Sequence, residues 1–112
     1  MSLTSKTTGT TQIITVHSDR IDAAMAIQFK EDMRKEAEDG STWIILDLTK
    51  VEFIDSSGLG AIVASMKQLG SDCRLDLAGL HPFVEKVFRL TRMDTVFKLF
   101  ASLDDALSTL KD

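Results

Sequence analysis

The stretch that decides the fold is Val51–Val63, which reads VEFIDSSGLGAIV. It follows the apolar run Trp43–Leu48, which is short and nearly unbroken, as expected of a strand that is covered on both faces. After the Asp-Ser-Ser-Gly turn, apolar residues recur at helical spacing: Leu59, Ile62, Val63, Met66 and Leu69. The two serines, Ser56 and Ser57, therefore stand where a helix begins, and a helix start offers free backbone N–H groups and about half a positive charge.

The segment before this stretch shows the same change from strand to helix. Residues 12–17 are rich in β-branched side chains and are predicted to form a strand. A helix is then predicted from an acidic cap at Asp22 to about Asp39, with Gly40 as its C-cap. Its apolar side comprises Ala26, Phe29, Met33 and Ala37.

The segment after the serines predicts two further strands and two further helices. Residues 73–78 alternate as in a strand, and Pro82 suits the first turn of the next helix. The expected buried side of that helix is Phe83, Val84, Val87, Phe88 and Leu90. A last strand is expected over residues 96–100. Ser102, with Asp105 three residues later, resembles a capping box, and the terminal helix would bury Ala106, Leu107 and Leu110.

The order of these elements is one strand followed by repeated strand and helix pairs. Such alternation predicts an α/β fold, here a mainly parallel four- to five-stranded sheet with about four helices. The 112 residues are expected to form a single domain, with residues 1–10 frayed or forming an edge strand. Ligands and sites in such folds lie at the carboxyl ends of the strands, which is where the Asp-Ser-Ser-Gly turn falls.

Composition narrows the classes of function. The net charge is -4 and no basic run occurs, which argues against nucleic acid or an anionic membrane as partner. Cys73 is the one cysteine, so no internal disulfide can form and the cytoplasm is the default location. No apolar run is long enough to span a bilayer, and the first residues lack the apolar core of a signal peptide.

Serines at a helix start have two interpretations. The first is a plain cap, since Ser, Asp and Gly are favoured at such positions for stability alone. The second is a phosphorylation switch, because a helix N-terminus accommodates a phosphate. Gly58 and Gly60 would leave the surface open to another backbone.

The segment Phe53–Gly60 resembles the signature of the STAS family, the sulfate transporter and anti-sigma factor antagonist domains. The similarity extends to the strand Ile45–Leu48 and to the closing helix over residues 102–107. The resemblance implies a free-standing bacterial anti-sigma factor antagonist that binds an anti-sigma factor serine kinase, is released on phosphorylation, and is reset by a PP2C-type phosphatase. The implied acceptor is Ser56, with Ser57 as the alternative.

The resemblance also implies a partner-binding surface around the acceptor. Its candidate residues are Asp22, Asp55, Ser57, Gly58, Leu59 and Gly60. The family shows a Gly-Glu-Leu-Asp-like turn where this chain has Asp19-Arg20-Ile21-Asp22, so Asp19 replaces the glycine. Asp22 and Asp55 are expected to shape the acceptor turn and meet the kinase, and helix capping remains an alternative role for Asp22.

Other functions find less support in the sequence. The same fold could serve as a non-phosphorylated adaptor in a lipid-transport or stressosome-like complex, although retention of the Asp55-Ser56 pair favours the switch. A hydrolase using Ser56 lacks an evident base, so we expect no enzyme. We expect no metal and no cofactor, since His17 and His81 have no ligand neighbours at useful spacing and Gly58-x-Gly60 lacks the third glycine of a dinucleotide site. Cys73 is expected to be a small core residue.

Overall fold

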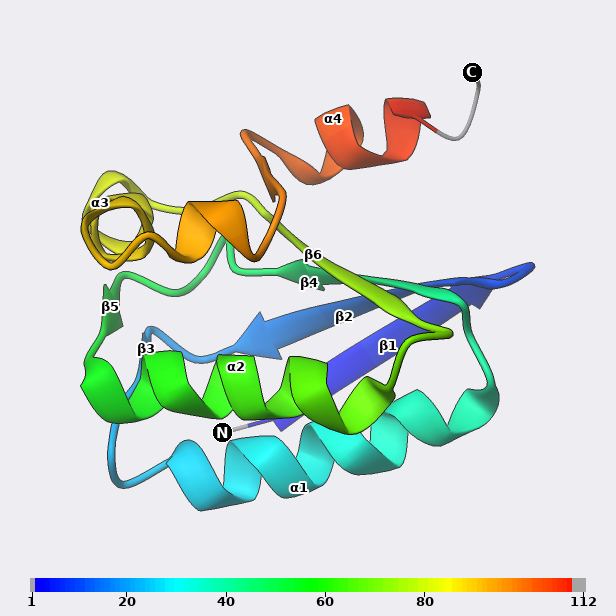
Figure 1. Cartoon of the computed structure of the whole chain (residues 1–112), viewed down its shortest axis with the longest axis horizontal. Helices are drawn as coiled ribbons and strands as arrows, with labels where there is room; N and C mark the ends of the chain where they lie inside the picture. The colour runs from blue at the N-terminus through cyan, green and yellow to red at the C-terminus, as the bar shows by residue number, and fades with distance from the viewer. Residues whose placement is uncertain (1, 110–112) are drawn as a thin grey trace.

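The computed structural model describes residues 2–109 and alternates strands with helices (Figure 1). The strands are β1 (Ser2–Thr8), β2 (Thr11–His17), β3 (Arg20–Ile21), β4 (Trp43–Asp47), β5 (Phe53–Ile54), β6 (Arg74–Ala78) and β7 (Leu99–Phe100). The α-helices are α1 (Ala26–Glu36), α2 (Ser56–Leu69), α3 (Pro82–Leu90) and α4 (Leu103–Ser108), and two 3-10 turns are η1 (Ala37–Asp39) and η2 (Met93–Thr95).

The main sheet has five strands in the order β1-β2-β4-β6-β7. All neighbouring pairs are parallel except β1 with β2, which is an antiparallel hairpin. The predicted fold class, a mainly parallel sheet with about four helices, is therefore confirmed. At one edge of the sheet, Ser2–Thr8 form the strand β1.

Helices cover both faces of the sheet, which explains the nearly unbroken apolar run in β4. Ile44 and Leu46 point into the larger core beneath α1, α2 and α3, whereas Ile45 points to a smaller core beneath α4. Figure 1 shows α4 on the opposite side of the sheet from α1 and α2. A central strand with apolar neighbours on both faces has no polar position to alternate with.

A second, two-stranded sheet was not predicted from the sequence. It pairs β3 with β5 in parallel, Arg20 opposite Phe53 and Ile21 opposite Ile54. Each strand buries its second residue and exposes its first. This small sheet lies beyond the carboxyl ends of β2 and β4 and connects them to α1 and α2, so it holds the two helix starts side by side (Figure 1).

Gly40, Pro82 and Ser102 stand at helix ends as predicted, whereas the start of α1 and the buried face of α3 differ from the prediction. Gly40 follows η1 in the left-handed conformation, and Ser102 accepts a hydrogen bond from the Asp105 N–H at 3.1 Å. In α3 only Val84 and Phe88 are buried, and the expectation that Phe83 and Leu90 face the core is wrong, since both are exposed.

The end of the chain also departs from expectation. The last strand is β7 alone, because the preceding residues form η2 and the backbone of Val96 stays helical. Ala106 is buried, while Leu110 lies outside the described residues. Between residues 2 and 109, no helix combines the length and the apolar character that crossing a membrane requires.

Candidate functional site

Asp55 fixes the start of α2. Its backbone is extended, with φ -108° and ψ -176°, and its Oδ1 accepts a hydrogen bond from the Gly58 N–H at 2.8 Å. This is the geometry of an N-cap, in which a side-chain oxygen satisfies an N–H group that the helix itself leaves free. The carboxylate charge also complements the positive end of the helix.

The second oxygen of the same carboxylate reaches another segment. Asp55 Oδ2 accepts a hydrogen bond from the Ala23 N–H at 3.1 Å, and the Asp55 N–H donates to the Ile21 carbonyl at 3.4 Å. Both oxygens of this half-buried side chain are thus used within the molecule. Asp55 ties the start of α2 to the turn that precedes α1.

Asp22 belongs to that turn and does not cap α1. Its Oδ1 accepts from the Ala24 N–H at 3.1 Å, and its carbonyl accepts from the Met25 N–H at 3.0 Å. The helix begins only at Ala26, and the N-cap residue Met25 makes no side-chain cap bond. The prediction of a helix cap at Asp22 is wrong because the residues after it close a turn of their own first. Arg20 lies 3.7 Å from the Asp22 carboxylate.

Gly58 faces inward, contrary to the expected open surface. It is buried, and a Cβ built on it would lie 2.0 Å from the carbonyl oxygen of Ile21. The backbone that approaches this glycine closely is therefore the chain's own strand β3, and Gly58 is needed for that packing. Gly60 is different, since it is exposed and a Cβ there would meet open space.

The two serines occupy the first two positions of α2, and both are exposed. Ser56 is thus accessible at the tip of the helix. Leu59 is half-buried and packs against the core. The accessible part of the turn is therefore formed by Ser56, Ser57 and Gly60, on a support built by Asp55 and Gly58.

Asp19, which stands where the family pattern has glycine, causes no backbone strain. Among the described residues other than glycine, Arg92 is the one with a positive φ. The Asp19 carbonyl accepts hydrogen bonds from the Glu52 and Phe53 N–H groups at 2.8 and 3.1 Å. The departure from the family pattern therefore leaves the β3-β5 contact intact.

An aromatic pair beside the turn was missed by the sequence reasoning. The rings of Phe53 and Phe83 stack with their centroids 5.7 Å apart and their planes at 11°. They are 40% and 49% exposed. The guanidinium of Arg20 lies over the Phe53 ring, 5.9 Å from its centroid. One signal was present in the sequence: Phe53 neighbours Ile54 in a strand, where only one of the two can face the core.

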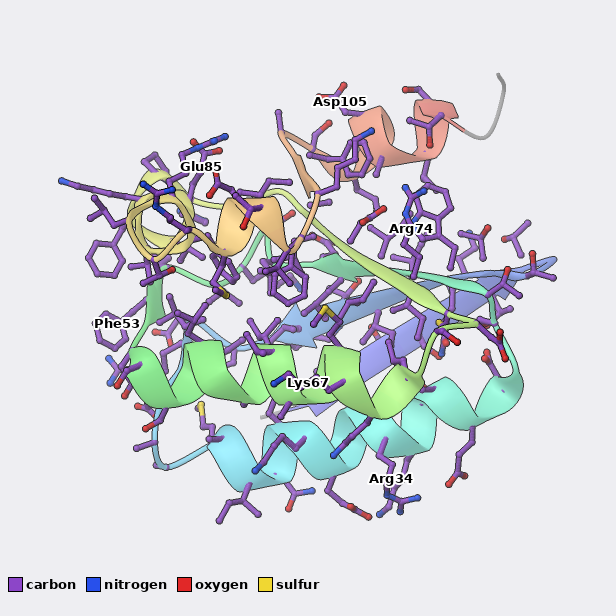
Figure 2. All side chains as sticks on the ribbon, viewed as in Figure 1. Arg34, Phe53, Lys67, Arg74, Glu85 and Asp105 are labelled. Carbon is purple, nitrogen blue, oxygen red and sulfur yellow. The ribbon has the colours of Figure 1, made fainter. Side chains whose placement is uncertain are left out.

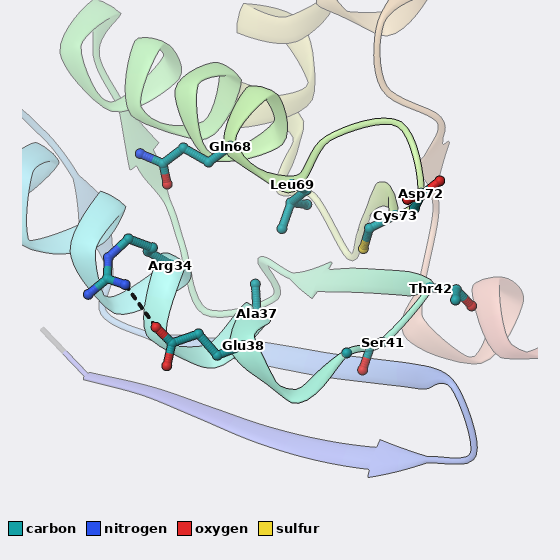
Figure 3. Close-up of a pocket in the computed structure, with 10 residues that line it drawn as sticks. Arg34, Ala37, Glu38, Ser41, Thr42, Gln68, Leu69, Asp72 and Cys73 are labelled. Carbon is teal, nitrogen blue, oxygen red and sulfur yellow. Dashed lines mark hydrogen bonds and ion pairs between the residues drawn. The ribbon is translucent and has the colours of Figure 1, made fainter.

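The opposite end of α2 holds a cavity of about 390 Å³ between the last turns of α1 and α2 (Figure 3). Arg34 in its wall is already paired, since it binds Glu31 at 2.7 Å and Glu38 at 2.8 Å. These bonds lower the pKa of Glu31 and raise that of Arg34. Burial, and then the nearby Asp39 charge, raise the pKa of the Cys73 thiol, which disfavours a reactive thiolate.

The histidines lie apart from the serines' helix. His17 contacts the Thr4 hydroxyl at 2.7 Å and the Lys50 ammonium at 2.9 Å. His81 contacts the Thr49 carbonyl oxygen at 2.7 Å. Within residues 2–109 no group of three or more His, Cys, Asp and Glu side chains is placed to hold a metal ion.

Comparison with known proteins defines the class. The family model of the STAS domain matches residues 2–106, and the chain belongs to this family. It is 28% identical over 91 residues to the anti-sigma-F factor antagonist RsfB of Mycobacterium tuberculosis, covering 81% of this chain and 75% of RsfB. It is 27% identical over 92 residues to the putative anti-sigma factor antagonist BtrV of Bordetella bronchiseptica, covering 81% and 79%.

A solved structure agrees over almost the whole chain. The crystal structure of an anti-sigma factor antagonist from Mycobacterium paratuberculosis superposes with a TM-score of 0.86 and 26% sequence identity, covering 99% of this chain and 94% of that one.

Proposed function

We propose that this protein is an anti-sigma factor antagonist, which binds an anti-sigma factor serine kinase while Ser56 is unmodified and is released when Ser56 is phosphorylated. The observation that carries the proposal is the exposed Ser56 at the first position of α2, on a turn fixed by both oxygens of Asp55. The chain's similarity to anti-sigma factor antagonists supports the same role.

The geometry makes phosphorylation compatible with the fold. Phosphoserine carries about -1.5 to -2 charges at neutral pH, and the positive end of α2 would stabilise that charge by roughly 0.3–2 kcal/mol. The turn is held by backbone bonds to Asp55 that do not involve the serine hydroxyls. The modified protein should therefore keep its structure.

The added charge would weaken the complex with the partner. Turning a complex from 99% bound to 99% free requires about 5.5 kcal/mol of differential affinity. A dianion that must lose its water against an apolar or acidic partner surface can supply an effect of this size. A PP2C-type phosphatase would restore the binding form, and these steps would take place in the cytoplasm.

The residues around the acceptor take separate parts in this proposal. Ser57 and Gly60 would contact the partner directly, and Leu59, which packs against the core, would contact it only through its exposed part. Asp22 and Asp55 would act mainly by shaping the turn, because their carboxylates bind backbone N–H groups of the chain itself. Gly58 is buried and would contribute through the packing of α2 against β3.

Intact mass spectrometry tests the acceptor. The protein is incubated with ATP and the candidate anti-sigma factor kinase, and a gain of one phosphate is expected. Ser56→Ala should abolish this gain, while Ser57→Ala, its matched neighbour on the same helix turn, should retain most of it. Loss of the phosphate in Ser57→Ala alone would move the acceptor by one residue.

Ser56→Asp tests the switch itself. This variant should weaken binding to the kinase, while its melting temperature stays close to that of the wild type. Unfolding of Ser56→Asp would contradict the helix-start argument. If no candidate kinase phosphorylates the protein and it instead co-purifies stably with a membrane complex, the adaptor role would replace the proposed one.

A further inference from the structure

Two large aromatic rings are left half-uncovered beside the acceptor turn. Among the described residues the exposed large apolar side chains are Ile27, Phe53, Phe83, Leu90 and Val96. The two aromatic members of this set, Phe53 and Phe83, touch each other. We propose that this stacked pair is the apolar anchor on which the anti-sigma factor docks. This inference rests on the proposed function and names the surface that provides the affinity.

The pair is rigid, because each ring stands on a fixed backbone. Phe53 lies in β5, paired with Arg20 of β3, and its N–H donates to the Asp19 carbonyl at 3.1 Å. Phe83 follows Pro82 in the first turn of α3. The rings stack nearly parallel, with their planes at 11°. A partner can cover the exposed part of each ring with little loss of side-chain entropy.

The position of the pair beside Ser56 favours the anti-sigma factor kinase as the protein that covers it. Phe53 lies two residues before the cap Asp55 and three before Ser56, on the strand that leads directly into α2. Figure 2 shows Phe53 at the end of the molecule where α2 begins. A kinase that brings ATP to the Ser56 hydroxyl has to cover this end of the molecule, so the rings are continuous with its contact surface.

The charged groups next to the aromatic pair indicate which charge the partner's surface should carry. Glu52, next to Phe53 in the chain, is exposed, whereas the Asp19 carboxylate lies 3.8 Å from Arg20, whose guanidinium is already over the Phe53 ring. The complementary surface is therefore an apolar side chain against the exposed parts of the rings, with a cation opposite Glu52. Such a cation would speed association and make it depend on salt, while the rings would set the rate of dissociation.

This arrangement also explains how a phosphate could release the partner. A contact over aromatic rings excludes water, and a dianion added at Ser56 would have to lose its hydration next to that contact. Binding and phosphorylation therefore depend on different groups, the rings and the hydroxyl. Changing a ring should lower affinity in the unmodified protein, whereas removing the hydroxyl should leave that affinity intact.

The test compares three variants by isothermal titration calorimetry with the anti-sigma factor kinase. Phe83→Ser and, separately, Phe53→Ser are each expected to weaken binding by about 30-fold or more, as is common for aromatic hot spots. Val96→Ser is the matched control, because Val96 is similarly exposed, at 44%, and lines a groove with Lys67 and Gly70 at the other end of α2. It should bind within about twofold of the wild type.

Any other outcome contradicts the inference, and the outcomes can be distinguished from one another. A melting temperature close to the wild type is required of the variant that is interpreted, and two ring variants are available for this reason. Tight binding by a folded ring variant would remove the anchor and leave the proposed function standing if Ser56 is still phosphorylated. Failure of the wild type to bind or be phosphorylated would remove both. Self-association of the wild type that a ring variant abolishes would assign the rings to a second copy of this chain.

Discussion

The two ends of α2 differ in how their polar groups are used. At its start the carboxylate of Asp55 is bonded internally, while Ser56 and the rings of Phe53 and Phe83 remain exposed. At its other end a cavity of about 390 Å³ is present, but Arg34 and Glu38 in its wall bind each other. The candidate site is therefore marked by a hydroxyl and aromatic rings that stay exposed on a rigid support, and these groups do not line the cavity.

The largest effect is expected from Gly58→Ala, which tests whether the start of α2 is rigid. The new Cβ would lie 2.0 Å from the Ile21 carbonyl oxygen, so backbone would have to move. We expect a loss of about 3 kcal/mol in the free energy of unfolding, measured by urea denaturation. The matched control is Gly60→Ala, where the space is open and alanine should stabilise the helix by about 0.5–1 kcal/mol. Equal effects of the two changes would show that the β3 contact is loose.

A smaller effect is expected from Asp55→Ala. This change removes the cap of α2 and the bond to the Ala23 N–H together, and we expect a loss of about 2 kcal/mol by thermal or urea denaturation.

Ser102→Ala at the start of α4 is the control for Asp55→Ala, because the Ser102 side chain makes a cap bond but no bond to a second segment. Its substitution should lower the free energy of unfolding by about 1 kcal/mol. If Asp55→Ala loses no more stability than Ser102→Ala, the hydrogen bond from the Ala23 N–H to Asp55 contributes nothing to stability.

At the other end of the helices, Asp39 gives a prediction with a pH dependence. Its carboxylate accepts bonds from the Ser41 hydroxyl at 2.7 Å, the Ser41 N–H at 3.0 Å and the Thr7 hydroxyl at 2.8 Å. The bond from the Ser41 hydroxyl is the main reason that the pKa of Asp39 lies below its ordinary value of 3.8. A carboxyl group of this kind stabilises the fold above its unfolded pKa, and the effect is lost as pH falls through the lower folded pKa.

Asp39→Asn should therefore be less stable than the wild type by a constant amount near neutral pH. Melting curves should show this difference shrinking as the pH falls below about 4. A difference that persists unchanged in acid would assign the effect to hydrogen-bond geometry rather than to the charge.

The smallest effect is expected from Arg34→Ala. Its ion pairs with Glu31 and Glu38 are exposed, and such pairs are screened by water and contribute little to stability. Affinity for the kinase should not change, because Arg34 lines the cavity with Gln68 and Leu69 at the end of α2, whereas the serines are at its start. Loss of binding in a folded Arg34→Ala protein, measured by calorimetry, would break the contrast between the two ends.

The sequence was a good guide where one physical requirement dominated. The nearly unbroken apolar run in β4 follows from cover on both faces, and Asp55, Ser102 and Gly40 stand at helix ends for local reasons of hydrogen bonding and conformation. These requirements are local, so they can be recognised without the tertiary structure.

The sequence was a poor guide where two patterns competed. In α3, Val87 can share a helical stripe either with Phe83 and Leu90 or with Val84 and Phe88, and periodicity alone does not say which stripe is buried. The structure packs Val87 against the core together with Val84 and Phe88. The inward position of Gly58 depends on the two-residue strand β3, which is too short to leave a pattern. The aromatic pair at the candidate site was missed for the first of these reasons, since Phe83 was assigned to the core.

Because both carboxylate oxygens of Asp55 accept hydrogen bonds from backbone amides, those amides can report on whether the turn is closed. The amides of Gly58 and Ala23 are bonded to one side chain from two different segments. In native-state hydrogen exchange, slow exchange at both positions would indicate a closed turn, and simultaneous acceleration would reveal a concerted opening. The two exchange rates could then follow modification of the neighbouring serine in solution without any label.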